Sequence, residues 1–188
     1  MWRLGGCSAT NDMSATSHDI QVLALDVDGV LTDGTITFDP STNQEVKTFH
    51  VHDGLGLSAW KRAGNEVVII SGRDAEAVTR RAIELGITHV YQGSTDKIAD
   101  LQRALDQIGA SSSQTAFVGD DLGDIPLLQH VGYAIAVANA SNEVKDMADW
   151  VTTRNGGHGA VRDAVEHLMK MSGRWAEFAS GCSTETAQ

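Results

Sequence analysis

Residues 20–29 read Ile-Gln-Val-Leu-Ala-Leu-Asp-Val-Asp-Gly, a mostly apolar run that ends in two aspartates and a glycine. Such a short apolar run is typical of a parallel strand that is buried on both faces. Similar runs at residues 67–70 and 115–118 end at Ser71 and at Gly119-Asp120. Because stretches of helical periodicity separate these runs, the sequence predicts an α/β fold with a doubly wound, mostly parallel sheet.

A β-hairpin is predicted directly after the first strand. Residues 35–38 and 46–51 are rich in β-formers, and residues 39–43 between them favour a turn. No insertion of cap size follows residues 71–73, so we expect no cap domain. A lone hairpin is marginally stable and exposes its strand edges. We therefore expect a second subunit to cover it, with packing onto its own domain as the alternative.

Composition indicates one domain between two tails. Residues 1–18 and 172–188 are rich in Ser, Thr, Ala and Gly and lack periodicity, so we expect a disordered N-terminal tail, a folded domain over residues 19–171 and a flexible C-terminal tail. The only two cysteines, Cys7 and Cys182, fall one in each tail. This usage favours a reduced, cytoplasmic protein over a secreted disulfide scaffold.

The overall charge narrows the class of partner. The formal net charge is −11, whereas nucleic acids and anionic membranes bind basic surfaces. No apolar run approaches the length needed to span a membrane. We therefore expect neither nucleic acid nor a membrane as partner.

The carboxyl ends of parallel strands meet at one edge of a sheet, and ligands bind there in folds of this kind. Asp26, Ser71 and Asp120 each stand at one of these ends. Asp28 can face the same cavity through its side chain and its main-chain carbonyl. Because hard oxygen ligands suit Mg²⁺, the sequence predicts a magnesium-dependent phosphoryl-transfer site.

The polar residues of this predicted site have candidate roles. Asp26 is the candidate nucleophile, through an aspartyl-phosphate, and Asp28 is the candidate general acid and then general base. Ser71 would donate a hydrogen bond to a phosphoryl oxygen, and Lys97 would neutralise developing charge. Taken singly, Ser71 is equally typical of a helix cap and Lys97 of a solvated lysine.

Two further aspartates and the spacing of the first pair refine the prediction. Asp124 is expected to bind Lys97 or a metal-bound water. Asp121 is expected either to contact the metal ligands without binding the metal itself or to be exposed to solvent.

A receiver-like signalling module, which also combines an acidic pocket with Mg²⁺ and a lysine, is the alternative class of protein. Asp28 argues against it, because a second carboxylate there can catalyse the dephosphorylation that a receiver must avoid. A non-catalytic domain on the same fold is a third possibility.

Four motifs stand in order along the chain, at residues 25–34, 70–73, 97 and 119–124. Together with residues 49–56 (Phe-His-Val-His-Asp-Gly-Leu-Gly) and 156–162 (Gly-Gly-His-Gly-Ala-Val-Arg), they resemble the haloacid dehalogenase-like superfamily over residues 19–170. The similarity is to its capless sugar-acid phosphatases, which act on 3-deoxy-D-manno-octulosonate 8-phosphate, and to the related domain attached to some acylneuraminate cytidylyltransferases.

This resemblance implies a Rossmann-like fold and an enzyme of lipopolysaccharide precursor synthesis. It implies Mg²⁺ held by Asp26, the main chain of Asp28 and Asp120. The residues implied to contact the substrate are Asp28, Asp53, Gly54, Arg73, Arg81 and Lys97. It also implies a cytoplasmic homotetramer in which the hairpins pack together and neighbouring subunits complete the sites.

One departure from the family pattern concerns the substrate. Many octulosonate phosphatases carry Arg before the Asp-Gly turn, where this chain has His52. A neutral imidazole offers fewer hydrogen-bond donors than a guanidinium group. A nine-carbon acid phosphate, such as N-acylneuraminate 9-phosphate, therefore stays open as the alternative substrate.

Overall fold

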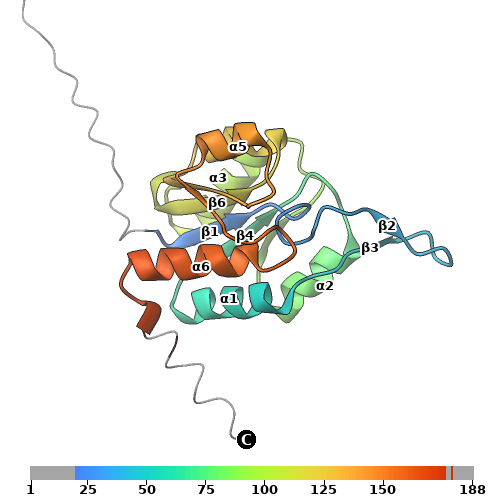
Figure 1. The fold of residues 1–188 in the computed structure, drawn as a ribbon, viewed down its shortest axis with the longest axis horizontal. Helices are drawn as coiled ribbons and strands as arrows, with labels where there is room; N and C mark the ends of the chain where they lie inside the picture. The colour runs from blue at the N-terminus through green and yellow to red at the C-terminus, as the bar shows by residue number, and fades with distance from the viewer. Residues whose placement is uncertain (1–19, 177–178, 180–188) are drawn as a thin grey trace, which may run out of the picture.

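The structure, a computed structural model, describes residues 20–176 and residue 179 (Figure 1). Within them, six parallel strands form one sheet in the order β5-β4-β1-β6-β7-β8. The strands of this sheet are β1 (Val22–Leu25), β4 (Glu66–Ile70), β5 (His89–Tyr91), β6 (Thr115–Gly119), β7 (Tyr133–Ala136) and β8 (Trp150–Val151). The α-helices are α1 (Val51–Arg62), α2 (Glu76–Glu84), α3 (Lys97–Ile108), α4 (Ile125–Leu128), α5 (Asn142–Met147) and α6 (Ala160–Met171). The predicted α/β fold without a cap domain is confirmed.

The core lies on both faces of the central strand. β1 pairs with β4 on one side and with β6 on the other, and all of its side chains are fully buried. In Figure 1, α1 and α6 cover one face of the sheet, and α3 and α5 cover the other. Each fully buried large apolar side chain contributes about 1.5–3 kcal/mol, so this double coverage stabilises the edge on which the predicted site lies.

The helix that carries Lys97 shows how local sequence sets the ends of an element. The carboxylate of Asp96 accepts a hydrogen bond from the amide of Ala99 at 3.1 Å and so caps the start of α3. Gly109 ends the helix in the left-handed conformation at φ 78°. Lys97 is thereby fixed at the first position of α3, at the edge where β1 and β6 end.

Among the described residues, no helix is long and apolar enough to cross a membrane.

The inserted hairpin is present but shorter than predicted. Its strands are β2 (Thr37–Phe38) and β3 (Glu45–Val46), which pair antiparallel. The prediction that the second arm runs over residues 46–51 is wrong, because α1 already begins at Val51. His50 caps that helix by accepting a hydrogen bond from the amide of His52 at 3.3 Å. In Figure 1 the hairpin projects away from the body of the domain.

The two predicted tails are described only in part. The N-terminal tail with Cys7, and most of the C-terminal tail with Cys182, lie outside the described residues. Residues 172–176 are described and contact the domain. The amide of Arg174 donates to the carbonyl of Met169 at 2.9 Å, and its guanidinium donates to the carbonyl of Ala63. This segment therefore packs against the ends of α1 and α6.

Candidate active site

A cavity of about 440 Å³ lies at the carboxyl ends of β1, β4 and β6. The residues that line it are Asp26, Asp28, Gly34, Ser71, Gly72, Arg73, Lys97, Asp120, Asp121, Gly123 and Asp124. The structure thus brings together all of the residues that the sequence proposed for catalysis and metal binding, and they come from separate segments of the chain.

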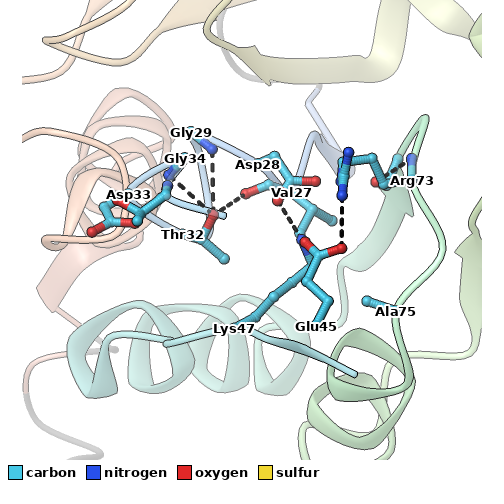
Figure 2. Close-up of polar contacts among 12 residues, drawn as sticks. Val27, Asp28, Gly29, Thr32, Asp33, Gly34, Glu45, Lys47, Arg73 and Ala75 are labelled. Atoms are coloured by element: carbon cyan, nitrogen blue, oxygen red, sulfur yellow. Dashed lines mark hydrogen bonds and ion pairs between the residues drawn. The ribbon is translucent and has the colours of Figure 1, made fainter. Parts of the chain in front are cut away.

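The turn after β1 presents Asp26 and Asp28 to this cavity. The carbonyl of Val27 accepts hydrogen bonds from the amides of the three residues from Val30 to Thr32, at 2.9–3.2 Å. The hydroxyl of Thr32 donates to the same carbonyl at 3.4 Å and accepts from the amide of Gly29 at 3.4 Å (Figure 2). Gly29 has φ 90°, a conformation that a residue with a side chain rarely adopts.

Asp26 is nearly buried and is held by a lysine. Its Oδ1 accepts from Nζ of Lys97 at 2.7 Å, and its exposed fraction is 6%. Burial, reinforced by the negative charge of Asp124, raises the pKa of Asp26 to about 6. Lys97 opposes this rise without cancelling it.

Asp124 holds Lys97 from the other side. Its Oδ1 accepts from Nζ of Lys97 at 2.7 Å, and its Oδ2 accepts from the amide of Asp120 at 3.0 Å. Burial alone would lower the pKa of Lys97, but the charges of Asp26 and Asp124 outweigh it and raise that pKa. Both oxygens of Asp124 are therefore engaged, as expected of a residue that orients the lysine.

Asp120 completes an acidic cluster that fits a divalent cation. Carboxylate oxygens of Asp26, Asp120 and Asp124 lie within 4.8 Å of one another. Burial, and then the charge of Asp26, raises the pKa of Asp120 to about 7. Burial disfavours the ionised form of a carboxyl group, and nearby negative charges add to this effect. Hard oxygen donors on one side of an open cavity are the ligands that Mg²⁺ prefers.

Ser71 and Arg73 form the wall contributed by β4. The amide of Ser71 donates to the carbonyl of Tyr91 at 2.8 Å, and the Ser71 carbonyl accepts from the amide of Ser94 at 2.9 Å. The Ser71 hydroxyl accepts from the amide of Arg73 at 3.1 Å, so it acts as a local cap in this state. The Arg73 side chain is 44% exposed and can meet a ligand.

Sequence reasoning missed two residues that contact side chains of the cavity lining, Lys47 and Glu45. Nζ of Lys47 forms an ion pair with Oδ1 of Asp28 and another with Oε1 of Glu45 at 2.7 Å (Figure 2). Oε2 of Glu45 accepts from Nη2 of Arg73 at 2.8 Å. The available signal was charge at alternate positions of the second hairpin arm, which places both side chains on one side of an extended strand.

Three predicted substrate contacts lie outside the cavity lining. Asp53 is 2% exposed, and its Oδ1 accepts from the amide of Arg162 at 2.8 Å, which caps α6. Burial raises the pKa of Asp53. Arg81 pairs with Glu84 at 2.8 Å. Its guanidinium packs so closely over Gly54 that a side chain at Gly54 would overlap it.

Asp121 lines the cavity at its exposed rim. Its side chain accepts from the amide of Leu122 at 2.8 Å, so it caps the short 3-10 helix η2 (Leu122–Asp124). Asp121 is not a member of the acidic cluster formed by Asp26, Asp120 and Asp124.

The glycine-rich segment near residue 156 packs against the turn that carries Asp28. The amide of Gly157 donates to the carbonyl of Val30 at 3.0 Å, and the amide of Gly156 donates to Oδ1 of Asn139 at 2.8 Å. A methyl group at Gly156 would overlap the carbonyl of Gly29. The segment therefore needs glycine because two backbone segments touch there.

Comparison with known proteins gives concordant matches. A family model described as haloacid dehalogenase-like hydrolase matches residues 82–164. The 3-deoxy-D-manno-octulosonate 8-phosphate phosphatase KdsC of Escherichia coli (strain B / BL21-DE3) is 40% identical over 166 residues, which are 88% of this chain and 88% of that protein.

Two solved structures resemble the fold closely. One is a 3-deoxy-D-manno-octulosonate 8-phosphate phosphatase from Moraxella catarrhalis in complex with a magnesium ion, a phosphate ion and a KDO molecule. It has a TM-score of 0.85 at 38% identity, and the match covers 92% of this chain and 99% of that one. The other is the cobalt-bound deoxy-D-mannose-octulosonate 8-phosphate phosphatase (YrbI) of Haemophilus influenzae, with a TM-score of 0.84 at 35% identity, covering 90% and 99% of the two chains.

Proposed function

Because this chain belongs to the 3-deoxy-D-manno-octulosonate 8-phosphate phosphatase family of haloacid dehalogenase-like hydrolases, we propose that it is a Mg²⁺-dependent phosphomonoesterase acting on a sugar-acid phosphate. The substrate that we propose is 3-deoxy-D-manno-octulosonate 8-phosphate, within lipopolysaccharide precursor synthesis. The observation that carries the proposal is the cluster of Asp26, Lys97 and Asp120 in one cavity, in a chain 40% identical to a phosphatase of that name.

The proposed metal ligands are the carboxylates of Asp26 and Asp120 and the main-chain carbonyl of Asp28. Support comes from the raised pKa values of Asp26 and Asp120, which a nearby cation would offset. When bound, the ion screens the aspartates from the phosphate dianion and polarises the phosphoryl group.

In the proposed first step, a carboxylate oxygen of Asp26 bonds to phosphorus and the bond from phosphorus to the sugar oxygen breaks. Lys97, at 2.7 Å from Asp26, orients this carboxylate and offsets charge that develops on the phosphoryl oxygens. The Ser71 hydroxyl would turn from the amide of Arg73 to donate to a phosphoryl oxygen. The product of this step is an aspartyl-phosphate.

Asp28 is the proposed proton donor and acceptor. It gives a proton to the departing sugar oxygen, then takes one from the water that attacks the aspartyl-phosphate. Inorganic phosphate leaves and Asp26 is regenerated. The exposed fraction of the Asp28 side chain, 24%, leaves it accessible from the cavity.

The sugar acid itself would be recognised by basic groups beside the cavity. Arg73 lines the cavity and is the residue that we propose for contact with the substrate carboxylate. We retain Arg81 and the Asp53-Gly54 turn as proposed contacts further along α2 and α1. Because His52 stands where many relatives of this type carry Arg, a nine-carbon acid phosphate is the second candidate substrate.

We propose a homotetramer in which the hairpins pack together. Support comes from large apolar side chains that the hairpin leaves exposed: Ile36 at 52%, Phe38 at 56% and Val46 at 46%. Such residues on a projecting element are a common mark of a subunit contact. We also propose that the protein works in the cytoplasm, as its sparse cysteine usage suggests.

The test is a phosphate-release screen with the purified protein and Mg²⁺. Eight-carbon and nine-carbon sugar-acid phosphates are compared with ordinary hexose phosphates. We expect the eight-carbon ester to have the highest kcat/KM, and EDTA to remove the activity. Preference for a hexose phosphate would overturn the substrate class, and full turnover in EDTA would overturn the metal.

The nucleophile is tested separately with Asp26→Asn. This variant should release no phosphate and keep its fold, whereas Asp106→Asn, on the exposed face of α3, should behave as the unchanged protein. Retained turnover by Asp26→Asn would eliminate Asp26 as nucleophile.

A further inference from the structure

Lys47 follows the hairpin strand β3, yet its side chain is 2% exposed. Nζ contacts two carboxylates, Oδ1 of Asp28 and Oε1 of Glu45 (Figure 2). A buried ammonium group is tolerated only where such partners offset the loss of hydration. The hairpin therefore places a fixed positive charge directly against Asp28.

The contact is one link of a longer chain of charges. Glu45 holds Lys47 with one oxygen and Arg73 with the other, the latter at 2.8 Å. The amide of Arg73 in turn donates to the hydroxyl of Ser71. The hairpin is thereby tied both to the turn after β1 and to the loop after β4, the two segments that meet a phosphate in the proposed reaction.

The pairing also restricts how Asp28 can be oriented. Lys47 engages Oδ1, which leaves Oδ2 to face a ligand in the cavity. Without the lysine, rotation about the Asp28 side chain would present either oxygen, or neither. General acid catalysis depends on hydrogen-bond reach to the proton that moves, so an error of about 1 Å in this group is costly.

A direct role for Lys47 on the substrate fits the contacts less well. Its ammonium already meets two carboxylates and is almost inaccessible to solvent. Lys97 and Arg73 line the cavity, whereas Lys47 does not. Lys47 therefore acts on the reaction through Asp28.

We propose that Lys47 is a positioning residue for the phosphatase reaction: it fixes one oxygen of Asp28, so that the other meets the departing sugar oxygen, and it makes the hairpin part of the catalytic apparatus. This inference rests on the role proposed above for Asp28.

The test compares Lys47→Met, Lys47→Arg and Asp28→Asn on two esters. One is the sugar-acid phosphate, whose alkoxide leaving group needs a proton. The other is p-nitrophenyl phosphate, whose phenolate leaves without one. kcat/KM reports the steps up to and including phosphoryl transfer to Asp26. It therefore reports proton donation to the leaving group separately from the later hydrolysis of the aspartyl-phosphate. Lys170→Met, which removes an exposed lysine from an ion pair with Glu166, is the matched control.

For Lys47→Met we expect kcat/KM on the sugar ester to fall on the order of 10²-fold through kcat, with KM little changed. The aryl ester should be affected far less, and Lys47→Arg should recover part of the loss. Equal losses on both esters, or a loss that follows a fall in Tm, would show a merely structural role and overturn the proposal.

The reference variant separates this inference from the proposed function. If Asp28→Asn loses the sugar-ester activity while Lys47→Met keeps it, the positioning role is wrong and the function of Asp28 stands. If Asp28→Asn keeps full activity on the sugar ester, the role of Asp28 fails, and that of Lys47 fails with it.

Discussion

At the scale of single residues, the acidic cluster determines how stability depends on pH. Folding raises the pKa of Asp26 to about 6 and that of Asp120 to about 7, from a value of 3.8. Between pH 3.8 and about pH 7, the folded protein therefore binds more protons at these two carboxyl groups than the unfolded chain does. Its stability without metal is therefore highest at the acidic end of this window and falls as pH rises through it.

We accordingly predict that the Tm of EDTA-treated protein falls as the pH rises from about 4 to about 7, the range between the pKa values of these two carboxyl groups in the unfolded chain and in the folded protein. Mg²⁺ should raise Tm most at the upper end, because it binds the ionised carboxylates. Thermal melts across this range, with and without Mg²⁺, measure both trends. Asp120→Asn should flatten the metal-free curve, and a metal-free Tm that rises with pH would contradict the prediction.

Gly156 is a second residue with a testable role, because it allows close contact between two backbone segments beside the site. A methyl group there would overlap the carbonyl of Gly29, so Gly156→Ala must push apart the two backbone segments. We predict a loss of about 1–3 kcal/mol in the free energy of unfolding, together with reduced kcat, because the turn that carries Asp28 is displaced.

Urea denaturation and steady-state kinetics measure the two effects. Gly123→Ala is the stability control, since a methyl group there would meet open space. Unchanged stability of Gly156→Ala would mean that the backbone contact relaxes without cost.

At the scale of elements, Asp53 joins two helices. It lies in the first turn of α1 and accepts from the amide of Arg162 in α6 at 2.8 Å. We predict that Asp53→Ala lowers the free energy of unfolding by about 1–3 kcal/mol. Asp53→Asn, which keeps an acceptor oxygen, should lose less.

Urea denaturation of both variants measures this, and kinetics separate the structural role from the proposed substrate contact. If Asp53 meets the substrate, Asp53→Asn should raise KM even where stability is nearly kept. If it serves only the helices, KM should stay constant while stability falls.

The elements that sequence could predict are those that local pattern defines. The apolar run before Asp26 and the cap at Asp96 each lie within a few residues of the structure they produce. Lys47 could not be found this way, because its partner Asp28 is 19 positions away and the contact depends on where the hairpin lies. The same holds for Asp53 and Arg162, 109 positions apart.

The start of α1 shows a different limit. Residues 46–51 have strand propensity, but only Val46 pairs with a strand, opposite Thr37. Val51 is helical because His50 caps the helix and no strand pairs with residues 47–51. Tertiary context overrides β propensity wherever a partner strand is absent. The edge of the sheet that holds the site could be predicted, and so could Asp124 as a partner of Lys97, whereas Lys47 as the partner of Asp28 could not.

At the scale of the whole molecule, the hairpin is the element through which we expect the subunits of the proposed tetramer to contact one another. We predict that Phe38→Glu shifts the protein from a tetramer to smaller species, because a charge cannot be buried in an apolar contact without a partner. Sedimentation velocity measures the size. Met147→Glu, at an apolar residue of α5 that is 42% exposed, should leave it unchanged. A monomeric unchanged protein would refute the assembly itself.

The contact between Gly156 and Gly29 has a consequence for biosynthesis. The ribosome makes the turn that carries Asp26 and Asp28 early, but the backbone that packs against this turn is made only after most of the polypeptide has been translated. A nascent chain that stops short of residue 156 therefore contains Asp26 and Asp28 without the segment that packs against their turn. We therefore expect the chain to become able to cleave a phosphate ester only late in synthesis, once the segment at Gly156 can pack against the turn after β1.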